Sequence, residues 1–165
     1  MRESRLAGPH YDVDTFEARQ SVGYLIRRLH NLTMPRAEAL FDEDDFTFSQ
    51  WIVLMAVRDG IASTCAEVAR HLDHDPGATT RLVDQLEERG LMERKRSTDD
   101  RRVVRLAITP AGKAMAKRLL PRLIDFWNTT LKDFSHDEFE QLLSLMTRLM
   151  TALEARPDGT KVRAK

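Results

Sequence analysis

Residues 91–109 read LMERKRSTDDRRVVRLAIT, which is two strand-like runs on either side of a polar turn tipped with arginine. In the second run Val104, Leu106 and Ile108 occupy every other position, and this is the period of a strand that buries one face. Asp99 and Asp100 supply turn chemistry between the two runs. The stretch therefore predicts a small β-hairpin with those three apolar side chains on its buried face.

The predicted hairpin is basic, although the whole chain is electrically balanced. Residues 89–105 hold seven Arg or Lys side chains and three acidic ones, whereas the full chain of 165 residues has 26 basic and 26 acidic side chains. A basic hairpin after a compact pair of helices is typical of proteins that bind the DNA backbone and the minor groove. Because the net charge is zero, the sequence predicts a local nucleic-acid patch rather than indiscriminate coating of nucleic acid.

Two short helices are predicted immediately before the hairpin. Thr64 and Glu67 have the spacing of a capping box, which begins the first helix, and Asp75-Pro76 begins the second as N-cap and first helical residue. The second helix is expected to end at Gly90. Its buried stripe is predicted to be Ala78, Leu82, Val83 and Leu86, with polar residues on its wet side. The pattern is therefore helix, tight turn, helix, hairpin.

Longer helices are predicted on both sides of this unit. A helical apolar period runs from about residue 13 to residue 41, and Pro35 predicts a kink or break near residues 31–34. A capping box at Thr47 opens the next helix. After the hairpin, a helix begins at residues 109–110 and is expected to be interrupted at Pro121. A capping box at Ser135 opens a last helix with too many apolar positions for a solvated surface.

Three ordered stretches are specific enough to indicate a family. They are residues 47–54 (TFSQWIVL), residues 80–91 (TRLVDQLEERGL), and Asp100-Arg101-Arg102 leading to residues 106–112 (LAITPAG). Over roughly residues 15–155 the chain resembles the multiple-antibiotic-resistance regulator (MarR) family of winged-helix transcription factors. The resemblance implies a triangular dimer whose interface is formed by the first and the last two helices. It also implies a recognition helix in the major groove and a hairpin wing in the minor groove.

The predicted fold class is mostly α-helical with a small β-hairpin wing, a winged helix-turn-helix combined with a helical dimerisation region. We expect a flexible arm (residues 1–12), an N-terminal dimerisation helix kinked near Pro35 (13–45), a DNA-binding domain (46–109), C-terminal dimerisation helices (110–156) and a disordered basic tail (157–165). Pro35 and Pro121 are not part of the family pattern.

The residues predicted to contact DNA lie on the two short helices and on the hairpin. Arg101 or Arg102 is expected to enter the narrow minor groove, and Asp100 to orient Arg102 and the wing; a solvated turn is the alternative. Side chains of the recognition helix are expected to reach phosphates or base edges. The full predicted set is Thr64, Gly77, Ala78, Thr79, Thr80, Arg81, Asp84, Gln85, Arg94, Arg96, Asp100, Arg101 and Arg102.

A ligand pocket and a dimer interface are also predicted. A cleft between the dimerisation and DNA-binding lobes, lined by aromatic and Met side chains, suits a flat aromatic acid, with ordinary core packing as the alternative. The predicted lining is Arg27, His30, Trp51, Met55 and Met115. The last helix would expose more apolar surface than a soluble monomer tolerates. The predicted interface is Phe16, Leu123, Trp127, Leu143, Met146, Leu149 and Met150.

The sequence thus predicts a homodimeric, sequence-specific DNA-binding regulator, a repressor that a small aromatic or phenolic acid releases from a palindromic operator. One alternative is a regulator that senses oxidant through Cys65, or a metal through the loosely spaced His71 and His74. A remote alternative is a helical interaction protein without DNA binding. No nucleophile–base pair, Gly-rich phosphate loop or spaced carboxylate cluster indicates an enzyme, and no cofactor or metal is expected.

The rest of the composition bears on the compartment. The single cysteine excludes an intrachain disulfide framework and fits a reducing compartment. No apolar run approaches the ~20 residues that span a bilayer, and the N-terminus lacks the apolar core of a signal peptide. We therefore expect a cytoplasmic protein of a bacterium or archaeon, associated with the nucleoid and without a membrane partner.

Overall fold

The computed structural model describes residues 9–96 and 103–155. The chain divides into two units, Met1–Leu119 and Leu120–Lys165, and each is described by itself. The predicted hairpin turn, with Asp99, Asp100, Arg101 and Arg102, lies outside the described residues. So do most of the predicted arm and the whole predicted tail.

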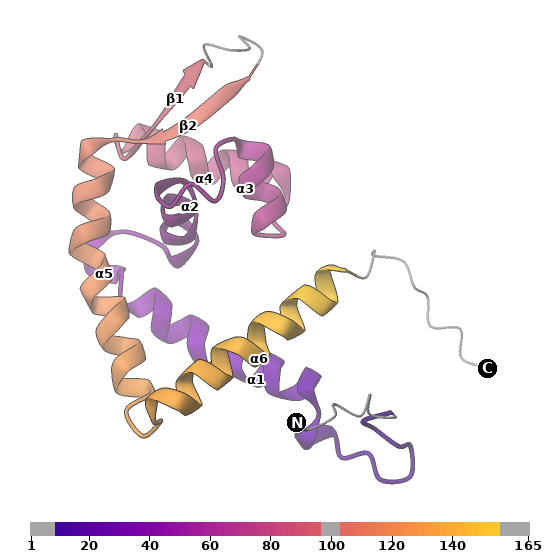
Figure 1. The fold of residues 1–165 in the computed structure, drawn as a ribbon. Coiled ribbons are helices and arrows are strands. Elements are labelled where there is room, and N and C mark those ends of the chain that lie inside the picture. The colour runs from indigo at the N-terminus through magenta and orange to yellow at the C-terminus, as the bar shows by residue number, and fades with distance from the viewer. Residues whose placement is uncertain (1–8, 97–102, 156–165) are drawn as a thin grey trace. The chain divides into compact units, whose positions relative to one another are not determined.

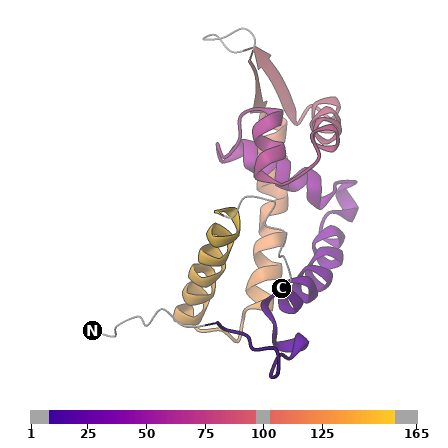
Figure 2. The same ribbon diagram turned by 90° about the vertical axis from the view of Figure 1, so that its right-hand side faces the viewer.

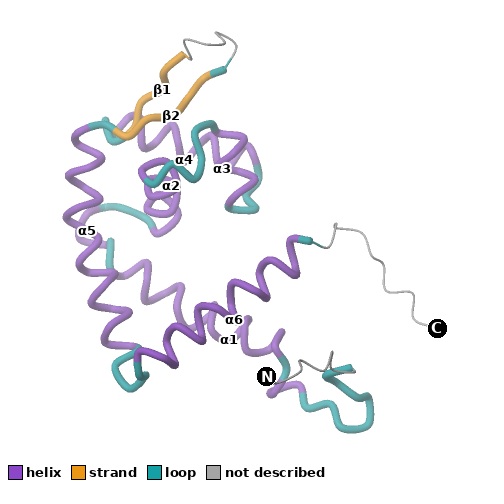
Figure 3. Tube along the Cα trace, viewed as in Figure 1, coloured by secondary structure: helices purple, strands orange, loops and turns teal. Residues whose placement is uncertain are grey.

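Three helices and a hairpin form the centre of the first unit (Figure 1). They are α2 (Phe48–Arg58), α3 (Cys65–His71), α4 (Pro76–Glu88), β1 (Met92–Arg96) and β2 (Val104–Ile108). Leu54, Val68 and Val83, one from each helix, are fully buried. α4 packs against both α2 and α3, and β2 packs against α2. The prediction of a mostly helical fold with a two-stranded hairpin is therefore confirmed (Figure 3).

Capping side chains fix where α2 and α4 begin. The Thr47 hydroxyl accepts a hydrogen bond from the backbone N–H of Gln50, and the Gln50 side chain accepts one from the backbone N–H of Thr47. Asp75 accepts from the backbone N–H of Ala78 at 2.9 Å, with Pro76 as the first helical residue. Both predicted helix starts are confirmed, because capping depends only on residues within one turn of each other.

The hairpin is buried only near its base. β1 and β2 pair antiparallel, with Met92 opposite Ile108 at one end and Arg96 opposite Val104 at the other. Leu106 is 6% exposed, as predicted, but Val104 is 43% exposed, so the prediction of a shared buried face is wrong at Val104. The outer end of the hairpin extends beyond the neighbouring helices (Figures 1 and 2), and its apolar position there faces solvent.

Helix α1 (Val22–Ala39) precedes the central helices and continues through Pro35, so the predicted break is wrong. A 3-10 turn, η1 (Ala18–Gln20), comes before it, and the helix starts well after residue 13 because Ser21 caps it. Another 3-10 turn, η2 (Asp42–Asp44), follows it. The guanidinium of Arg36 donates to the backbone carbonyl of Leu32, next to the hydrogen bond that the Pro35 ring cannot make.

An aromatic cluster connects the end of α1 with α2. The Phe41 ring is fully buried, stacks on Trp51 with the ring centroids 5.5 Å apart, and meets Phe46 edge-on. Arg89, at the C-terminal end of α4, lies over the Phe46 ring, 5.2 Å from its centroid, and donates to the backbone carbonyl of Asp45. The C-terminus of α4 is therefore attached to the segment between α1 and α2.

Helix α5 (Pro110–Thr130) continues through Pro121, so the predicted interruption is also wrong. The boundary between the two units falls within this helix, after Leu119. The described part of the second unit is the rest of α5 together with α6 (His136–Glu154). α6 begins with the predicted capping box, in which Ser135 and Glu138 each accept from the other's backbone N–H. The Ser135 backbone N–H and hydroxyl both donate to the Glu138 carboxylate, and these two bonds lower the pKa of Glu138.

The start of α5 lies against the base of the hairpin at a distance that only glycine permits. Thr109 donates its backbone N–H to the carbonyl of Leu91 at 3.1 Å and its hydroxyl to the carbonyl of Gly90 at 2.6 Å. A Cβ on Gly112 would lie 2.1 Å from the Leu91 carbonyl oxygen and 2.8 Å from Cγ1 of Ile108. The close approach therefore joins α5 to the hairpin.

We expect Gly112→Ala to destabilise the protein by about 2–3 kcal/mol, because the backbone carbonyl of Leu91 has to move. An alanine in a helix ordinarily stabilises it by about 0.5–1 kcal/mol relative to glycine. The matched control is Gly23→Ala in α1, where no atom lies within 4 Å of the added Cβ. Urea midpoints of the three proteins at equal concentration check this; a Gly112→Ala midpoint at or above the parent's contradicts it.

Candidate nucleic-acid interface

The solvent side of α4 carries five of the residues predicted to contact DNA. Arg81 and Gln85 are exposed and lie one turn apart, and Gly77, Ala78 and Thr80 are exposed nearer the helix start. The exposure of Ala78 contradicts its place in the predicted buried stripe. The helix nevertheless presents a continuous outer surface of small, hydroxyl, amide and guanidinium groups.

Thr79 lies on the opposite side of α4, in the core. Its side chain is 0% exposed, and it is buried with Val83 and Leu86 one and two turns later. The hydroxyl has no hydrogen-bond partner among the described residues. The prediction that Thr79 contacts DNA is therefore wrong, because the helical period places it on the inward stripe that Ala78 was expected to occupy.

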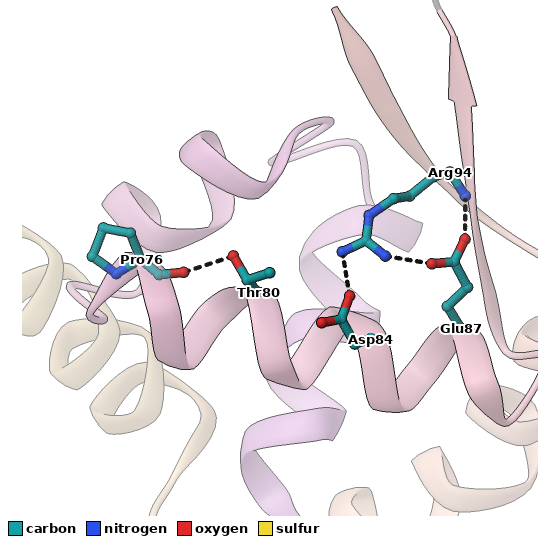
Figure 4. Close-up of polar contacts among 5 residues, drawn as sticks. All are labelled: Pro76, Thr80, Asp84, Glu87 and Arg94. Carbon is teal, nitrogen blue, oxygen red and sulfur yellow. Dashed lines mark hydrogen bonds and ion pairs between the residues drawn. The ribbon is translucent and has the colours of Figure 1, made fainter.

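Arg94 of β1 joins the hairpin to α4 through two carboxylates (Figure 4). Its guanidinium pairs with Asp84 at 2.6 Å and also with Glu87, and its backbone N–H donates to Glu87 Oε1 at 3.1 Å. Partial burial alone would lower the pKa of Arg94, but hydrogen bonds with Asp84, Glu87 and Cys65 outweigh it and raise that pKa. We name the group of Arg94, Asp84 and Glu87 the wing clamp.

The wing clamp changes the roles predicted for two residues. Arg94 was expected to neutralise a DNA phosphate and Asp84 to reach the DNA, but each has the other as an ion-pair partner. With Glu87 the cluster carries two negative charges and one positive, so it is not an anion site. Arg94 and Asp84 therefore orient the hairpin relative to α4. The sequence offered Glu87 no special signal, since its partner lies on a different element.

The start of α3 is tied to the other strand of the hairpin. Thr64 caps the helix through the backbone N–H of Glu67, but the Glu67 carboxylate accepts from the backbone and hydroxyl of Ser63, so the predicted capping box is incomplete. Leu106 donates its backbone N–H to the Ser63 carbonyl at 2.8 Å, and Arg105 donates to the Ser63 hydroxyl. The Ser63 hydrogen bonds, with a smaller contribution from the Arg105 charge, lower the pKa of Glu67.

Other polar groups in or beside the predicted interface already have hydrogen-bond or ion-pair partners within the protein. The Thr80 hydroxyl donates to the backbone carbonyl of Pro76 at 2.8 Å (Figure 4), and Thr64 uses its hydroxyl as a cap. Lys95 pairs with Glu93 on the same strand, whereas Arg96 is exposed at the outer end of β1. That Arg96, Arg81 and Gln85 contact DNA stays a prediction, as it does for the exposed start of α4.

The residues predicted to line a ligand pocket fall into different environments. Trp51 is 3% exposed and stacks on Phe41, which favours core packing, the alternative that the sequence left open. Met55 and Met115 are half-buried, and Arg27 and His30 are exposed on α1. A hollow of about 320 Å³ lies in the N-terminal segment between His10 and Gln20 and includes none of these five residues.

Within residues 9–96 and 103–155 there is neither a cluster of metal-ligating side chains nor a membrane-spanning helix. No three His, Cys, Asp or Glu side chains in that part are placed to hold a metal ion. None of the helices found there is long and apolar enough to cross a membrane. Cys65 is half-buried with a free thiol.

A helix pair with an exposed second helix, followed by a basic antiparallel hairpin that extends past the helices, defines a winged helix-turn-helix DNA-binding protein. The MarR family pattern matches residues 46–104. The multiple antibiotic resistance protein MarR of Salmonella typhimurium is 31% identical over 107 residues, which are 64% of this chain and 74% of that protein. This chain belongs to the MarR family and is a transcriptional regulator with a DNA-binding winged helix.

Other comparisons extend over more of the chain. The organic hydroperoxide resistance transcriptional regulator of Bacillus subtilis is 29% identical over 115 residues, 70% of this chain and 75% of that protein. The crystal structure of wild-type MarR from E. coli has a TM-score of 0.67 and 26% identity, covering 78% of this chain and 96% of that chain. The S. aureus MepR–DNA complex has a TM-score of 0.71 at 19% identity, covering 83% of this chain and 99% of that chain, and shows the shared fold.

Proposed function

We propose that this chain is a homodimeric repressor that binds a palindromic operator and that a small aromatic or phenolic acid releases from DNA. The observation that carries the DNA-binding part is the outer surface of α4, where Arg81 and Gln85 are exposed beside a hairpin that the wing clamp holds in place. In the proposal α4 lies in the major groove and the hairpin reaches the adjacent minor groove. A DNA-bound role implies a cytoplasmic location.

The wing tip belongs to the proposal on sequence grounds alone. Arg101 or Arg102 would enter the minor groove, where the negative potential is enhanced, and Asp100 would orient Arg102. Two subunits related by a two-fold axis would bind half-sites about one helical turn, or roughly 34 Å, apart. The affinity would then combine phosphate neutralisation by both subunits with base contacts from both copies of α4.

We expect operator binding to weaken steeply with salt, because each neutralised phosphate releases counterions. Arg81→Ala should reduce affinity about tenfold or more and lessen the salt dependence. The matched control is Arg58→Ala, which removes the same charge from the end of α2, where Arg58 pairs with Asp59. Full-length protein first selects its site from randomised duplexes, and fluorescence anisotropy then measures affinity at several salt concentrations. A flat salt titration, or equal losses from the two variants, contradicts the proposed surface.

The apolar face of α6 supports the dimer. Met146, Leu149, Met150 and Leu153 follow the three- and four-residue spacing of one helix face, and each is between 37% and 58% exposed. Leu143 is 48% exposed on the same spacing. Groups of exposed apolar side chains of this kind mark interaction surfaces in soluble proteins. The predicted partners Phe16 and Trp127 are also exposed, and Leu123 is half-buried, so all remain available to the proposed interface.

We expect the full chain to sediment as a species of twice its 19.0 kDa mass, and the double variant Met146→Glu, Met150→Glu to sediment as a monomer. Two carboxylates in an apolar interface would have to be desolvated without partners. Gln141→Glu with Ser144→Glu adds the same charges outside the apolar spacing of α6 and should leave the dimer intact. A parent chain that is monomeric at micromolar concentration removes the dimer from the proposal.

The proposed effector, an aromatic or phenolic acid, is supported by one structural relative and by four side chains of this chain. BpsR of Bordetella bronchiseptica, whose DNA binding is regulated by 6-hydroxynicotinic acid, is 22% identical with a TM-score of 0.71, covering 82% of this chain and 96% of that chain. Met55 and Met115, half-buried, supply apolar surface for an aromatic ring, and Arg27 or His30 would supply the cation for its carboxylate. The alternative effector is an oxidant, which the B. subtilis relative's name favours and which would react with the half-buried thiol of Cys65.

One challenge experiment separates the two effector classes. We expect benzoic, salicylic and hydroxynicotinic acids, offered to the protein–operator complex, to release DNA, because regulation requires a ligand that binds the free protein more tightly. The variant Cys65→Ser should respond equally. Release by cumene hydroperoxide alone, lost in Cys65→Ser, would instead establish oxidant sensing.

A further inference from the structure

We infer that Gln50, a core residue of α2, sets the base preference of Gln85 on α4, so that Gln85 selects keto bases (guanine or thymine) over amino bases (adenine or cytosine). The inference rests on the proposed placement of α4 in the major groove. Gln50 acts as a positioning residue, because it reaches the DNA only through Gln85.

The capping box at the start of α2 fixes which way the Gln50 amide is turned. The backbone N–H of Thr47 can only donate a hydrogen bond, and it lies 3.0 Å from Gln50 Oε1. The atom facing it must therefore be the amide oxygen. Gln50 is 6% exposed, and the Thr47 hydroxyl holds its backbone N–H as well. The amide nitrogen, Nε2, consequently points the other way, toward α4.

The orientation of Gln50 is passed on to Gln85. Gln50 Nε2 donates to Gln85 Oε1 at 3.1 Å, so the oxygen of Gln85 is turned toward the protein. Gln85 itself is exposed, and its Nε2 has no hydrogen-bond partner within residues 9–96 and 103–155. Gln85 therefore presents two N–H donors to solvent, one helical turn beyond the exposed Arg81.

A donor at this position distinguishes bases by one atom of the major-groove edge. Guanine O6 and thymine O4 accept hydrogen bonds, whereas the amino groups of adenine N6 and cytosine N4 donate them. A glutamine whose amide is free to turn binds adenine with both atoms, Oε1 to N6 and Nε2 to N7. In this protein Gln85 Oε1 is turned toward Gln50 and its two N–H donors face outward, so the two-atom pairing with adenine is disfavoured and a donor would face the amino group at N6 or N4.

The series of hydrogen bonds from Thr47 through Gln50 to Gln85 is called the relay. Gln50→Glu should reverse the direction of its last hydrogen bond while keeping the local fold. Glutamate also completes a capping box, with one carboxylate oxygen accepting from the backbone N–H of Thr47. Its other oxygen can only accept, so Gln85 has to turn and donate from Nε2, which points Gln85 Oε1 outward as an acceptor. At pH 8 the carboxyl is ionised, and the N-terminus of α2 favours that charge.

The experiment uses full-length protein and the operator recovered by selection. The base pair read by Gln85 is the one at which Gln85→Ala abolishes discrimination. At that pair, affinities for G·C against C·G and for T·A against A·T are compared, since inverting a pair keeps its composition. We expect the parent to prefer the keto base about tenfold, and Gln50→Glu to prefer the amino base by a similar factor. The double variant Gln50→Glu, Gln85→Ala carries the new charge without the relay and should show no preference.

Each result decides the inference. If Gln50→Glu is poorly folded by circular dichroism, Gln50→Leu replaces it: the Gln85 amide then turns freely, and the keto preference should fall to within about twofold. A keto preference that survives in Gln50→Glu or Gln50→Leu overturns the relay, as does a parent that prefers an amino base at this pair. A parent that selects no operator at all contradicts the proposed function instead, so the two failures are distinguishable.

Discussion

The hairpin of this protein keeps its direction because one guanidinium, that of Arg94, pairs with two carboxylates of α4 at once. Those carboxylates belong to Asp84 and Glu87, which lie one helical turn apart. The side chains of the three clamp residues are between 27% and 48% exposed, so solvent screens the pairs and each stabilises the fold by about 1 kcal/mol or less. The wing clamp instead fixes the orientation of β1, because a planar guanidinium held between two carboxylates of α4 permits few orientations of the strand.

Two other joints complete the DNA-binding domain, and each uses a different kind of contact. At the base of the hairpin, Gly112 lets α5 approach the Leu91 carbonyl closely. At the C-terminal end of α4, Arg89 combines a hydrogen bond to a backbone carbonyl with a position over the Phe46 ring. Both joints lie at the C-terminal end of α4, so that end of the helix is attached to α5 and to the segment between α1 and α2.

The sequence predicted correctly those features whose interacting residues lie close together along the chain, and it failed where they lie on different elements. The starts of α2, α4 and α6 were predictable because a cap and its partner lie within one turn, and the hairpin was predictable from alternation and turn residues. Whether Thr79 or Ala78 faces the core depends on how α4 is rotated against α2 and α3, which no local pattern fixes. Trp51 was ambiguous for the same reason, since aromatic residues serve cores and pockets alike.

The two prolines and the wing clamp show two more features that the sequence alone did not predict. Pro35 and Pro121 each remove one N–H donor, but both are exposed, so water can bind the carbonyl left without that donor and the helix continues. Arg94 was predicted as a phosphate ligand because its charge is visible in the sequence and its partners are not. Glu87 and Asp84 come seven and ten residues earlier, on another element, and only the packing of β1 against α4 brings them to it.

The stiffness of the wing clamp has a mechanical consequence. Strand β1 has five residues, so at about 3.3 Å per residue it is roughly 17 Å long, with its base packed on α4 and its outer end beyond the helices (Figure 1). Because Arg94, the middle residue of β1, is fixed to α4, a rotation of the helix moves the strand with it. A rotation of about 10° would carry the end of the strand roughly 3 Å, which is the length of a hydrogen bond. A small rotation of α4 thus becomes a larger displacement at the outer end of the hairpin. That displacement is large enough to break the proposed contact with a phosphate.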